Sequence, residues 1–314
     1  MLAGLRAYQE ARRDPQPEPM PAICETMGAS LRDYGGKGPT VLFVPSLINP
    51  PNVLDLSMEK SLLRWLAGRG HRVLLLDWGW DMGARRDLSV AGHVEQILLP
   101  FLREIAEPPA LVGYCLGGTM TIAAAALAEL RGVALIATPW HFAAFGPARQ
   151  TLESIWAGAE PAVESLGLLP MEVLQSAFWC LDSERTVQKF ERFSEMNPDS
   201  QEARAFVALE DWANDGPPIN GAAAREMFEG FFRDDLPGAG AWQVGGATIM
   251  PARLACPVLN IASTSDRVVP HATAAPCGER MDLSEGHVGM IVGSRAREAL
   301  WEPLEAWLSR LGGS

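Results

Sequence analysis

Several features that define large classes of protein are missing from this sequence. No stretch reaches the roughly 18 consecutive apolar residues that a membrane-spanning helix needs, and residues 1–20 lack the long apolar core of a signal peptide. Positive charge is also in deficit, because 38 acidic side chains outnumber 26 basic ones and give a net charge of −12. We therefore expect neither a transmembrane segment nor a nucleic-acid-binding face, which requires clustered basic residues.

Cysteine and histidine are both scarce, with five residues of each type. The cysteine count is odd and no close pair has the spacing of a zinc site, so the sequence suggests neither a disulfide framework nor a metal. We expect reduced thiols, a cytoplasmic location and no cofactor. The cysteines are Cys24, Cys115, Cys180, Cys256 and Cys277.

Buried strands and helices alternate near both ends of the chain. Short apolar runs bounded by glycine or proline predict strands, and amphipathic segments predict the helices between them. This alternation indicates the α/β class, with a mostly parallel sheet covered on both faces. The expected strands are 40–46, 71–79, 109–115, 132–139, 256–266 and 279–286, and the expected helices are 57–70, 90–106, 116–130 and 294–311.

A long segment without strand alternation interrupts this pattern. Residues 140–255 should be mainly helical, with a short hairpin at 241–249, and should form a cap inserted between strands. The α/β core would then consist of 23–139 and 256–314. Residues 1–22 are rich in proline and charge, and we expect them to form a flexible N-terminal tail.

The stretch Gly-Tyr-Cys-Leu-Gly-Gly joins an expected strand to an expected helix at Cys115. A sharp turn there would strain the backbone of its central residue and expose its side chain at the carboxyl edge of the sheet. Gly113 and Gly117 lack a Cβ and let neighbouring backbone approach closely. The helix N-terminus favours a thiolate and a developing oxyanion. We predict a nucleophilic cysteine, and a buried structural cysteine beside packing glycines is the alternative.

A nucleophilic cysteine needs a base and an acidic group that orients the base. In the fold that carries this kind of turn, the catalytic residues follow one another along the chain in the order nucleophile, acid, base. His287 and Asp266 each follow an expected strand, so both should lie at the sheet edge that carries Cys115. Asp77 also ends a strand, and it is either the rival acid or a carboxylate that caps a loop.

Attack on an acyl carbonyl creates an oxyanion that needs N–H donors. The backbone amide of Leu116, directly after the nucleophile, is the expected first donor. The second should come from the loop after the first strand of the core, at Ser46 or Leu47.

Seven sequence blocks resemble those of the polyhydroxyalkanoate synthases, which are α/β-hydrolase-fold enzymes with a cysteine nucleophile. One of these motifs, GYCLGG, is also found in dienelactone hydrolases, but those proteins are shorter and lack the large insertion. The resemblance covers about residues 40–310. The blocks, in the order of that family, are VPSLINPPNVLDL (44–56), VLLLDWGW (73–80), GYCLGG (113–118), TPWHF (138–142), LEDWANDGPP (209–218), CPVLNIASTSDRVVP (256–270) and GHVGMIVG (286–293).

The resemblance implies an α/β-hydrolase fold with a helical cap and an acyltransferase activity. Such synthases load a hydroxyacyl group from its coenzyme A thioester onto cysteine and then extend a polyester. The catalytic Cys, Asp and His of the family match Cys115, Asp266 and His287. Coenzyme A would enter only as part of the substrate. The family also suggests a second synthase subunit or a homodimer as partner, and a cytoplasmic location that includes the surface of polyester granules.

Two residues depart from the family pattern. Arg267 stands where these synthases usually have a histidine after the catalytic aspartate, and His141 stands where an acidic residue is usual. The main alternative is therefore a hydrolase of thioesters, polyester oligomers or lactones on the same scaffold. A non-catalytic protein of polyester granules is the third hypothesis, and the intact set of three catalytic residue types speaks against it.

Two further groups of residues have two interpretations each. Arg85 and Arg86 either meet a phosphate of coenzyme A or form an exposed, solvated pair. Five of the ten tryptophans lie in or beside the insertion, where they either line an acyl pocket that excludes water or form the core of the cap. These tryptophans are Trp140, Trp156, Trp179, Trp212 and Trp242.

Overall fold

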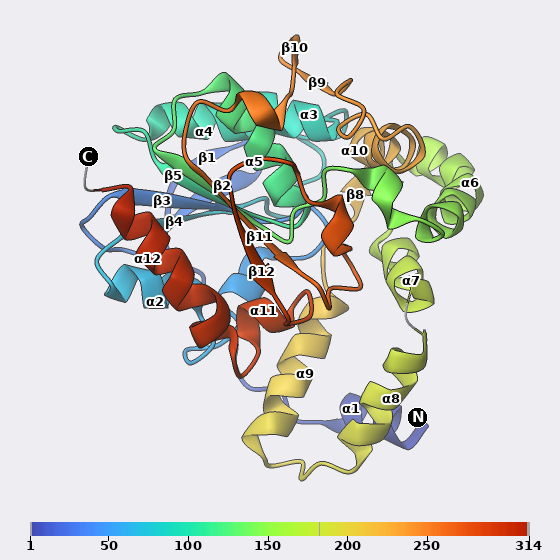
Figure 1. The fold of residues 1–314 in the computed structure, drawn as a ribbon. Helices are drawn as coiled ribbons and strands as arrows, with labels where there is room; N and C mark the ends of the chain where they lie inside the picture. The colour runs from blue at the N-terminus through green and yellow to red at the C-terminus, as the bar shows by residue number, and fades with distance from the viewer. Residues whose placement is uncertain (1, 182, 313–314) are drawn as a thin grey trace.

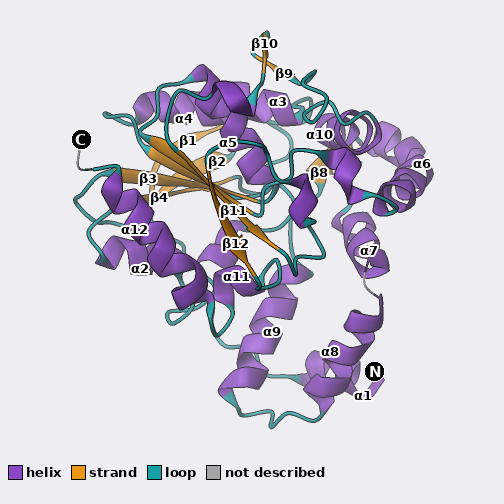
Figure 2. Ribbon diagram, in the orientation of Figure 1, coloured by secondary structure: helices purple, strands orange, loops and turns teal. Residues whose placement is uncertain are grey.

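The computed structural model describes residues 2–181 and 183–312 and centres on one large sheet. Figures 1 and 2 show the sheet in the middle of the molecule with helices around it. Its eight strands follow the order β1-β2-β4-β3-β5-β6-β11-β12, and the six from β4 to β12 are parallel. The strands are β1 Ala22–Thr26, β2 Ala29–Asp33, β3 Thr40–Val44, β4 Arg72–Asp77, β5 Ala110–Tyr114, β6 Gly132–Ile136, β11 Val258–Ser263 and β12 Glu279–Leu283.

Helices cover both faces of the sheet, because successive residues of its buried strands point to opposite sides. In β3, Val41 and Phe43 pack with the helices of one face, whereas Leu42 and Val44 pack with those of the other. The predicted parallel sheet with two covered faces is therefore confirmed. One face carries α2 Leu62–Gly68, α11 Gly289–Val292 and α12 Glu302–Arg310, and the other carries α3 Val90–His93, α4 Leu99–Glu104 and α5 Leu116–Leu127.

The segment between β6 and β11 is mainly helical, as the loss of strand alternation predicted. The predicted hairpin is also present, with β9 Gln243–Val244 antiparallel to β10 Ala247–Thr248. No helix in the described ranges has both the length and the apolar character to span a bilayer. The helices of this segment are α6 Ala148–Leu166, α7 Met171–Leu181, α8 Ser183–Ser194, α9 Gln201–Ala213 and α10 Gly221–Arg225. A short antiparallel pair, β7 Leu168–Leu169 and β8 Ile219–Asn220, joins the chain after α6 to the chain before α10.

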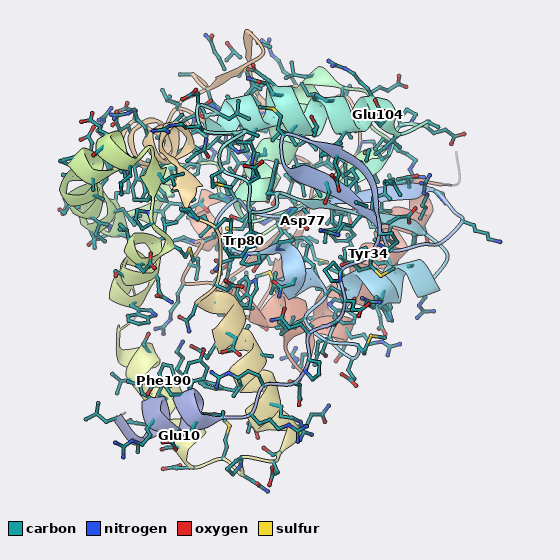
Figure 3. All side chains as sticks on the ribbon, turned by 180° about the vertical axis from the view of Figure 1, so that it is seen from behind. Glu10, Tyr34, Asp77, Trp80, Glu104 and Phe190 are labelled. Carbon is teal, nitrogen blue, oxygen red and sulfur yellow. The ribbon has the colours of Figure 1, made fainter. Side chains whose placement is uncertain are left out.

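The structure differs from the expected flexible tail over residues 1–22. Helix α1 Leu2–Glu10 occupies the first part of this segment and packs against α8. A Cβ added at Gly4 would stand 1.8 Å from the carbonyl oxygen of Phe190, so the two backbones meet at a glycine. Figure 3 shows Phe190 beside α1 in the view from behind. Because the contact depends on one glycine, it adds no apolar residues at helical spacing to the sequence of α1, and the helix was therefore not predicted.

Side chains also fasten this helix to α9. The Tyr8 hydroxyl donates a 2.6 Å hydrogen bond to Asp211, and Arg13 forms an ion pair with the same carboxylate at 3.1 Å. Ala7, Tyr8 and Ala11 pack on a small apolar cluster that belongs to α8 and α9 and is separate from the clusters of the sheet. The buried members of this cluster are Phe193, Ala203 and Val207.

The edge hairpin formed by β1 and β2 was also missed by the sequence analysis. Strand β1 has no fully buried residue, so it lacks the apolar run that marked the other strands. The turn between the strands is formed by Met27 and Gly28, whose φ angles are 49° and 75°. Positive values at both positions are typical of a tight hairpin turn. Methionine is rare at the first position, which removed the usual sequence signal.

Candidate active site

The predicted strained turn is present at Cys115, between β5 and α5. The residue has φ 55° and ψ −130°, a backbone conformation that residues with a side chain seldom adopt. Its amide donates a 2.9 Å hydrogen bond to the carbonyl of Ile136 on the neighbouring strand. Its carbonyl accepts a bond of the same length from the amide of Gly118 in the first turn of α5. The strain is thus held from both sides.

Glycines surround this turn because backbone segments meet there. A Cβ on Gly117 would lie 2.1 Å from the carbonyl oxygen of Val44 and 2.4 Å from that of Pro45. A Cβ on Gly113 would lie 2.4 Å from the Cα of Gly118. These contacts bring the loop after β3 against the start of α5, next to the cysteine.

His287 and Asp266 lie together in the structure. The two atoms His287 Nδ1 and Asp266 Oδ2 are 2.7 Å apart, and the two side chains are 9% and 1% exposed. The other carboxylate oxygen of Asp266 accepts hydrogen bonds from the backbone amides of Val268 and Val269, at 2.8 and 2.9 Å. Both oxygens are therefore fixed, and the carboxylate orients the imidazole ring.

The rival acid, Asp77, lies elsewhere and has structural partners. Its carboxylate forms a 2.6 Å ion pair with Arg32 of β2 and accepts a 3.0 Å hydrogen bond from the amide of Gly79. Figure 3 shows Asp77 at the back of the molecule, near Trp80. These contacts agree with the interpretation of Asp77 as a carboxylate that caps the loop after β4.

The surroundings of His287 favour a protonated imidazole. Burial lowers the pKa of His287, but the negative charge and hydrogen bond of Asp266, together with the adjacent Cys115, raise it to about 10. The ring also stacks on the buried Tyr114 ring, with 5.1 Å between centroids. The Tyr114 hydroxyl donates a 3.2 Å hydrogen bond to the carbonyl of His287. An imidazole in this setting can accept the proton of the Cys115 thiol and hold it.

The other described cysteines lack these features. Cys24, Cys256 and Cys277 carry free thiols, and burial raises the pKa of each, to about 11 for Cys277. A raised pKa lowers the fraction of reactive thiolate. The side chain of Cys180 lies outside the described part of the chain. Cys115 is therefore the described thiol with the best setting for nucleophilic attack.

The amides predicted as oxyanion donors lie on the two segments that meet at Gly117. Ser46 turns the loop after β3, because its hydroxyl accepts a 3.1 Å hydrogen bond from the amide of Ile48. No hydrogen bond found among the described residues uses the amides of Leu116, Ser46 or Leu47. Ser46 and Leu116 each line a cavity with Cys115, whereas the Leu47 side chain packs in the core. The amide positions are compatible with an oxyanion site.

Two cavities meet at Cys115. The larger, about 210 Å³, extends past His287 to a polar wall that contains Lys189 and Glu210. The smaller, about 70 Å³, is lined apart from Cys115 only by apolar side chains. The cysteine thus lies between a polar and an apolar compartment. The apolar lining includes Phe142, Phe145, Leu152, Leu174, Phe228 and Phe232.

The tryptophans divide between the two expected roles. Trp212 and Trp179 line the larger cavity, where the Trp212 indole donates a 2.8 Å hydrogen bond to the Pro50 carbonyl and Trp179 is 49% exposed. The other three are buried and line neither cavity, so they are part of the packing of the cap. These are Trp140, Trp156 and Trp242.

The arginine pair fits neither of its two interpretations. Arg85 is 1% exposed, and its guanidinium donates to the carbonyls of Asp81 and Gly79 at 3.2 and 3.1 Å. Burial lowers the pKa of Arg85. The expected exposed or phosphate-binding pair is therefore wrong for Arg85, which stabilises the loop after β4. Only Arg86 is exposed.

Two polar residues of the larger cavity were missed by the sequence analysis. Ala203, Val207 and Glu210 are buried on one face of α9, at the helical positions i, i+4 and i+7. A charged residue within the apolar face of a predicted helix can be recognised in the sequence, and it would have marked Glu210 as a candidate site residue. Lys189 of α8 carried no such signal, since its partner is 21 positions away.

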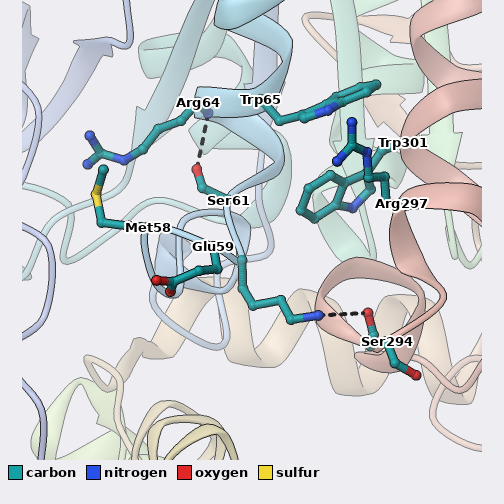
Figure 4. Close-up of a pocket in the computed structure, with 10 residues that line it drawn as sticks. Met58, Glu59, Ser61, Arg64, Trp65, Ser294, Arg297 and Trp301 are labelled. Carbon is teal, nitrogen blue, oxygen red and sulfur yellow. Dashed lines mark hydrogen bonds between the residues drawn. The ribbon is translucent and has the colours of Figure 1, made fainter. Parts of the chain in front are cut away.

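Another depression, about 390 Å³, lies between the start of α2 with the loop before it and residues 293–301, which precede α12 (Figure 4). Its basic residues are already engaged, since Arg64 pairs with Asp55 at 2.7 Å and Lys60 donates to the Gly293 carbonyl at 3.2 Å. The indoles of Trp65 and Trp301 pack against each other along one side of it. None of the predicted catalytic residues lines this depression, so we do not treat it as the active site.

Known proteins similar to the chain include polyester polymerases. No protein-family model matches it. It is 26% identical to the poly(3-hydroxyalkanoate) polymerase subunit PhaC of Haloarcula marismortui over 302 residues, which cover 91% of this chain but 64% of that protein. The PhaC subunit of Allochromatium vinosum is 26% identical over 288 residues, covering 86% of this chain and 80% of that protein. The resemblance to polyhydroxyalkanoate synthases is thereby confirmed, and the chain spans less than two thirds of the Haloarcula protein.

Similar solved structures include a lipase and an esterase. The monoacylglycerol lipase of Paleococcus ferrophilus has a TM-score of 0.53 and 16% identity, and covers 90% of this chain and 99% of its own. A thermophilic esterase from Thermogutta terrifontis has a TM-score of 0.52 and 16% identity, with 95% and 100% covered. These similarities confirm the α/β-hydrolase fold. With the polymerase relatives, they indicate an enzyme of the α/β-hydrolase superfamily.

Proposed function

We propose that this protein is a polyhydroxyalkanoate-synthase-like acyltransferase that acts on hydroxyacyl thioesters of coenzyme A. Cys115 is the nucleophile, His287 the general base and Asp266 the group that orients it. The observation that carries the proposal is the 2.7 Å contact between His287 and Asp266 beside a cysteine in a strained turn. Similarity to PhaC subunits along 86–91% of the chain supports the substrate class.

In the first half of the reaction His287 takes the proton of the Cys115 thiol. The thiolate sulfur attacks the carbonyl carbon of the thioester, and the carbonyl electron pair moves to the oxygen. Amides of Leu116 and of Ser46 or Leu47 donate hydrogen bonds to this oxyanion. When the carbonyl re-forms, the bond to the coenzyme A sulfur breaks and the leaving thiolate takes the proton from His287. The product is an acyl-cysteine.

In the second half an acceptor hydroxyl attacks the acyl-cysteine. His287 removes the proton of the acceptor, the new ester bond forms, and the bond to Cys115 breaks with return of the proton to sulfur. A hydroxyl at the end of another hydroxyacyl group gives polyester extension. Asp266 stabilises the imidazolium in both halves without itself gaining a proton.

Hydrolysis is the second candidate, and one observation favours it. The larger cavity reaches the surface at Trp179, which is 49% exposed, so water has a path toward the acyl-cysteine. Water in place of the acceptor hydroxyl would release a free hydroxyacid by the same steps. The two reactions share every catalytic group and differ only in the acceptor.

The first prediction tests both candidates with 3-hydroxybutyryl coenzyme A. The protein should release coenzyme A, and the second product should be polyester for a transferase or 3-hydroxybutyrate for a hydrolase. Cys115→Ala should lower the rate by at least about 10⁴-fold, because the substitution removes the sulfur on which the proposed covalent intermediate forms. Cys256→Ala, at a thiol that lines neither cavity, is the matched control and should keep full activity. Undiminished release by Cys115→Ala would refute the mechanism.

A further inference from the structure

An ion pair between two helices borders the larger cavity beside Cys115. Lys189 of α8 donates to both carboxylate oxygens of Glu210 of α9, at 2.8 and 2.7 Å. Glu210 is only 6% exposed, and both side chains line the cavity. Apolar side chains of similar size often hold buried helices together at least as well, because burying two charges removes them from water. Helix packing alone therefore does not explain the pair.

The pair retains hydrogen-bonding capacity toward the cavity. An ammonium group has three N–H donors and a carboxylate can accept about four hydrogen bonds, so their mutual contacts leave positions on both groups. Gln175 and Asn214, which are hydrogen-bonded to each other, extend the same wall. A wall that can both donate and accept hydrogen bonds fits a ligand that contains amide groups.

The smaller cavity offers no such partners. Its lining is aromatic and aliphatic apart from Cys115. An amide placed there would lose its hydrogen bonds to water without replacement, which is unfavourable. A thioester whose carbonyl lies at Cys115 therefore directs its short acyl chain into the smaller cavity. Its thiol portion, which carries the amide groups in coenzyme A, extends into the larger one.

On the basis of the proposed function, we infer that Lys189 and Glu210 bind the amide-containing arm of coenzyme A and select coenzyme A thioesters over simpler ones. Lys189 donates to an amide carbonyl and Glu210 accepts from an amide N–H. Contacts that bind the arm equally in the ground state and the transition state act on KM and not on kcat, and we expect the two residues to act in this way. The two residues are specificity residues and take no part in the bond changes.

The test compares 3-hydroxybutyryl coenzyme A with the S-ethyl thioester of 3-hydroxybutyrate, which lacks the arm. The double variant Lys189→Gln/Glu210→Gln removes both charges without leaving one buried alone. We expect its KM to rise about tenfold for the coenzyme A thioester, with kcat unchanged and with no change for the ethyl thioester. Arg204→Gln is the matched control. Arg204 lies on α9, as Glu210 does, but it is outside the larger cavity, and its exposed ion pair with Asp14 is 3.4 Å long.

Each other outcome has a definite meaning. An equal rise of KM for both thioesters would refute the inference in favour of a purely structural pair, and unchanged KM for both would refute it outright. If the double variant does not fold, Lys189→Arg keeps the ion pair but redirects its N–H donors and should again raise KM only for the coenzyme A thioester. If the wild-type protein consumes neither thioester, the proposed function fails and the inference fails with it. If the wild-type protein turns over the coenzyme A thioester but the variants show no selective rise of KM for it, the inference is refuted and the proposed function stands.

Discussion

The sheet and the α1–α8–α9 helices hold their parts of the site in different ways. Cys115 and Asp266 follow buried strands whose parallel neighbours fix them, and the backbone contact at Gly117 leaves no room for a Cβ. Lys189 and Glu210 stand on helices that are joined by side chains and by a small separate cluster. The groups that we propose for catalysis therefore lie on backbone held by the sheet, and the groups that we expect to select the substrate lie on helices held by side chains.

After loss of the nucleophile itself, the largest effect should come from the acid that orients the base. Asp266→Asn should lower the rate of thioester cleavage by about 10³–10⁴-fold, because an amide cannot stabilise the imidazolium of His287. Asp77→Asn, in the same sheet but paired with Arg32, should change the rate by less than about threefold despite some loss of stability. Initial rates of coenzyme A release decide the matter, and a reversed order of the two variants would show that the acid was misassigned.

The backbone constraint itself can be tested with two glycines. Gly117→Ala places a Cβ 2.1 Å from a carbonyl oxygen, so it should lower the free energy of unfolding by about 3 kcal/mol or more. Gly158→Ala on α6 has no atom within 4 Å of the added carbon and should raise the free energy of unfolding by up to about 1 kcal/mol through helix propensity. Denaturant unfolding measures both, and equal effects would contradict the contact at the turn.

The protonation of His287 should make the stability of the sheet region depend on pH. Its folded-state pKa of about 10 lies above its ordinary value of 6.5, so the imidazolium contributes fully below about pH 6.5 and its contribution is lost as the pH rises toward 10. The free energy of unfolding should fall by up to about 1.4 kcal/mol per pH unit in this window. In His287→Gln this part of the slope should disappear, and an unchanged slope would argue against the raised pKa.

The smallest effect should come from the helical layer. Tyr8→Phe removes the hydroxyl that donates to Asp211 at 2.6 Å, so it should lower the free energy of unfolding by about 1 kcal/mol. Glu10→Gln, at the exposed end of the same helix (Figure 3), should have almost no effect. Thermal unfolding of the two variants compares them, and a loss in Tyr8→Phe as large as in Gly117→Ala would erase the contrast between the two regions.

The sequence predicted what local physics determines. Five of the six parallel strands were predictable because they carry apolar residues in succession, such as Val41 and Leu42, as strands buried on both faces do. The edge strand β12 is mostly exposed and carries no such run. The turn at Cys115 was predictable because glycines before and after it mark close backbone contacts. Chain order already favoured Asp266 over Asp77 as the acid, and of the two only Asp266 contacts His287 in the structure.

What the sequence did not predict depends on contacts between distant segments. Helix α1 is stabilised by a glycine contact with α8 and by Tyr8, and neither produces an apolar period. Arg85 was expected at the surface because a cation is normally solvated, but backbone carbonyls of its own loop surround it. The pairing of Lys189 with Glu210 likewise arises from the packing of two helices and not from either helix alone.

The docking of α1 on α8 and α9 also affects the order of folding during synthesis. Tyr8 and its partner Asp211 are separated by 203 positions. At ribosomal rates of about 5–20 residues per second, α1 is made roughly 10–40 s before α9 leaves the ribosome. Strands β1 to β6 emerge in this interval, before α9 is available to α1. We therefore expect α1 to be among the last elements to acquire protection from hydrogen exchange in the nascent chain.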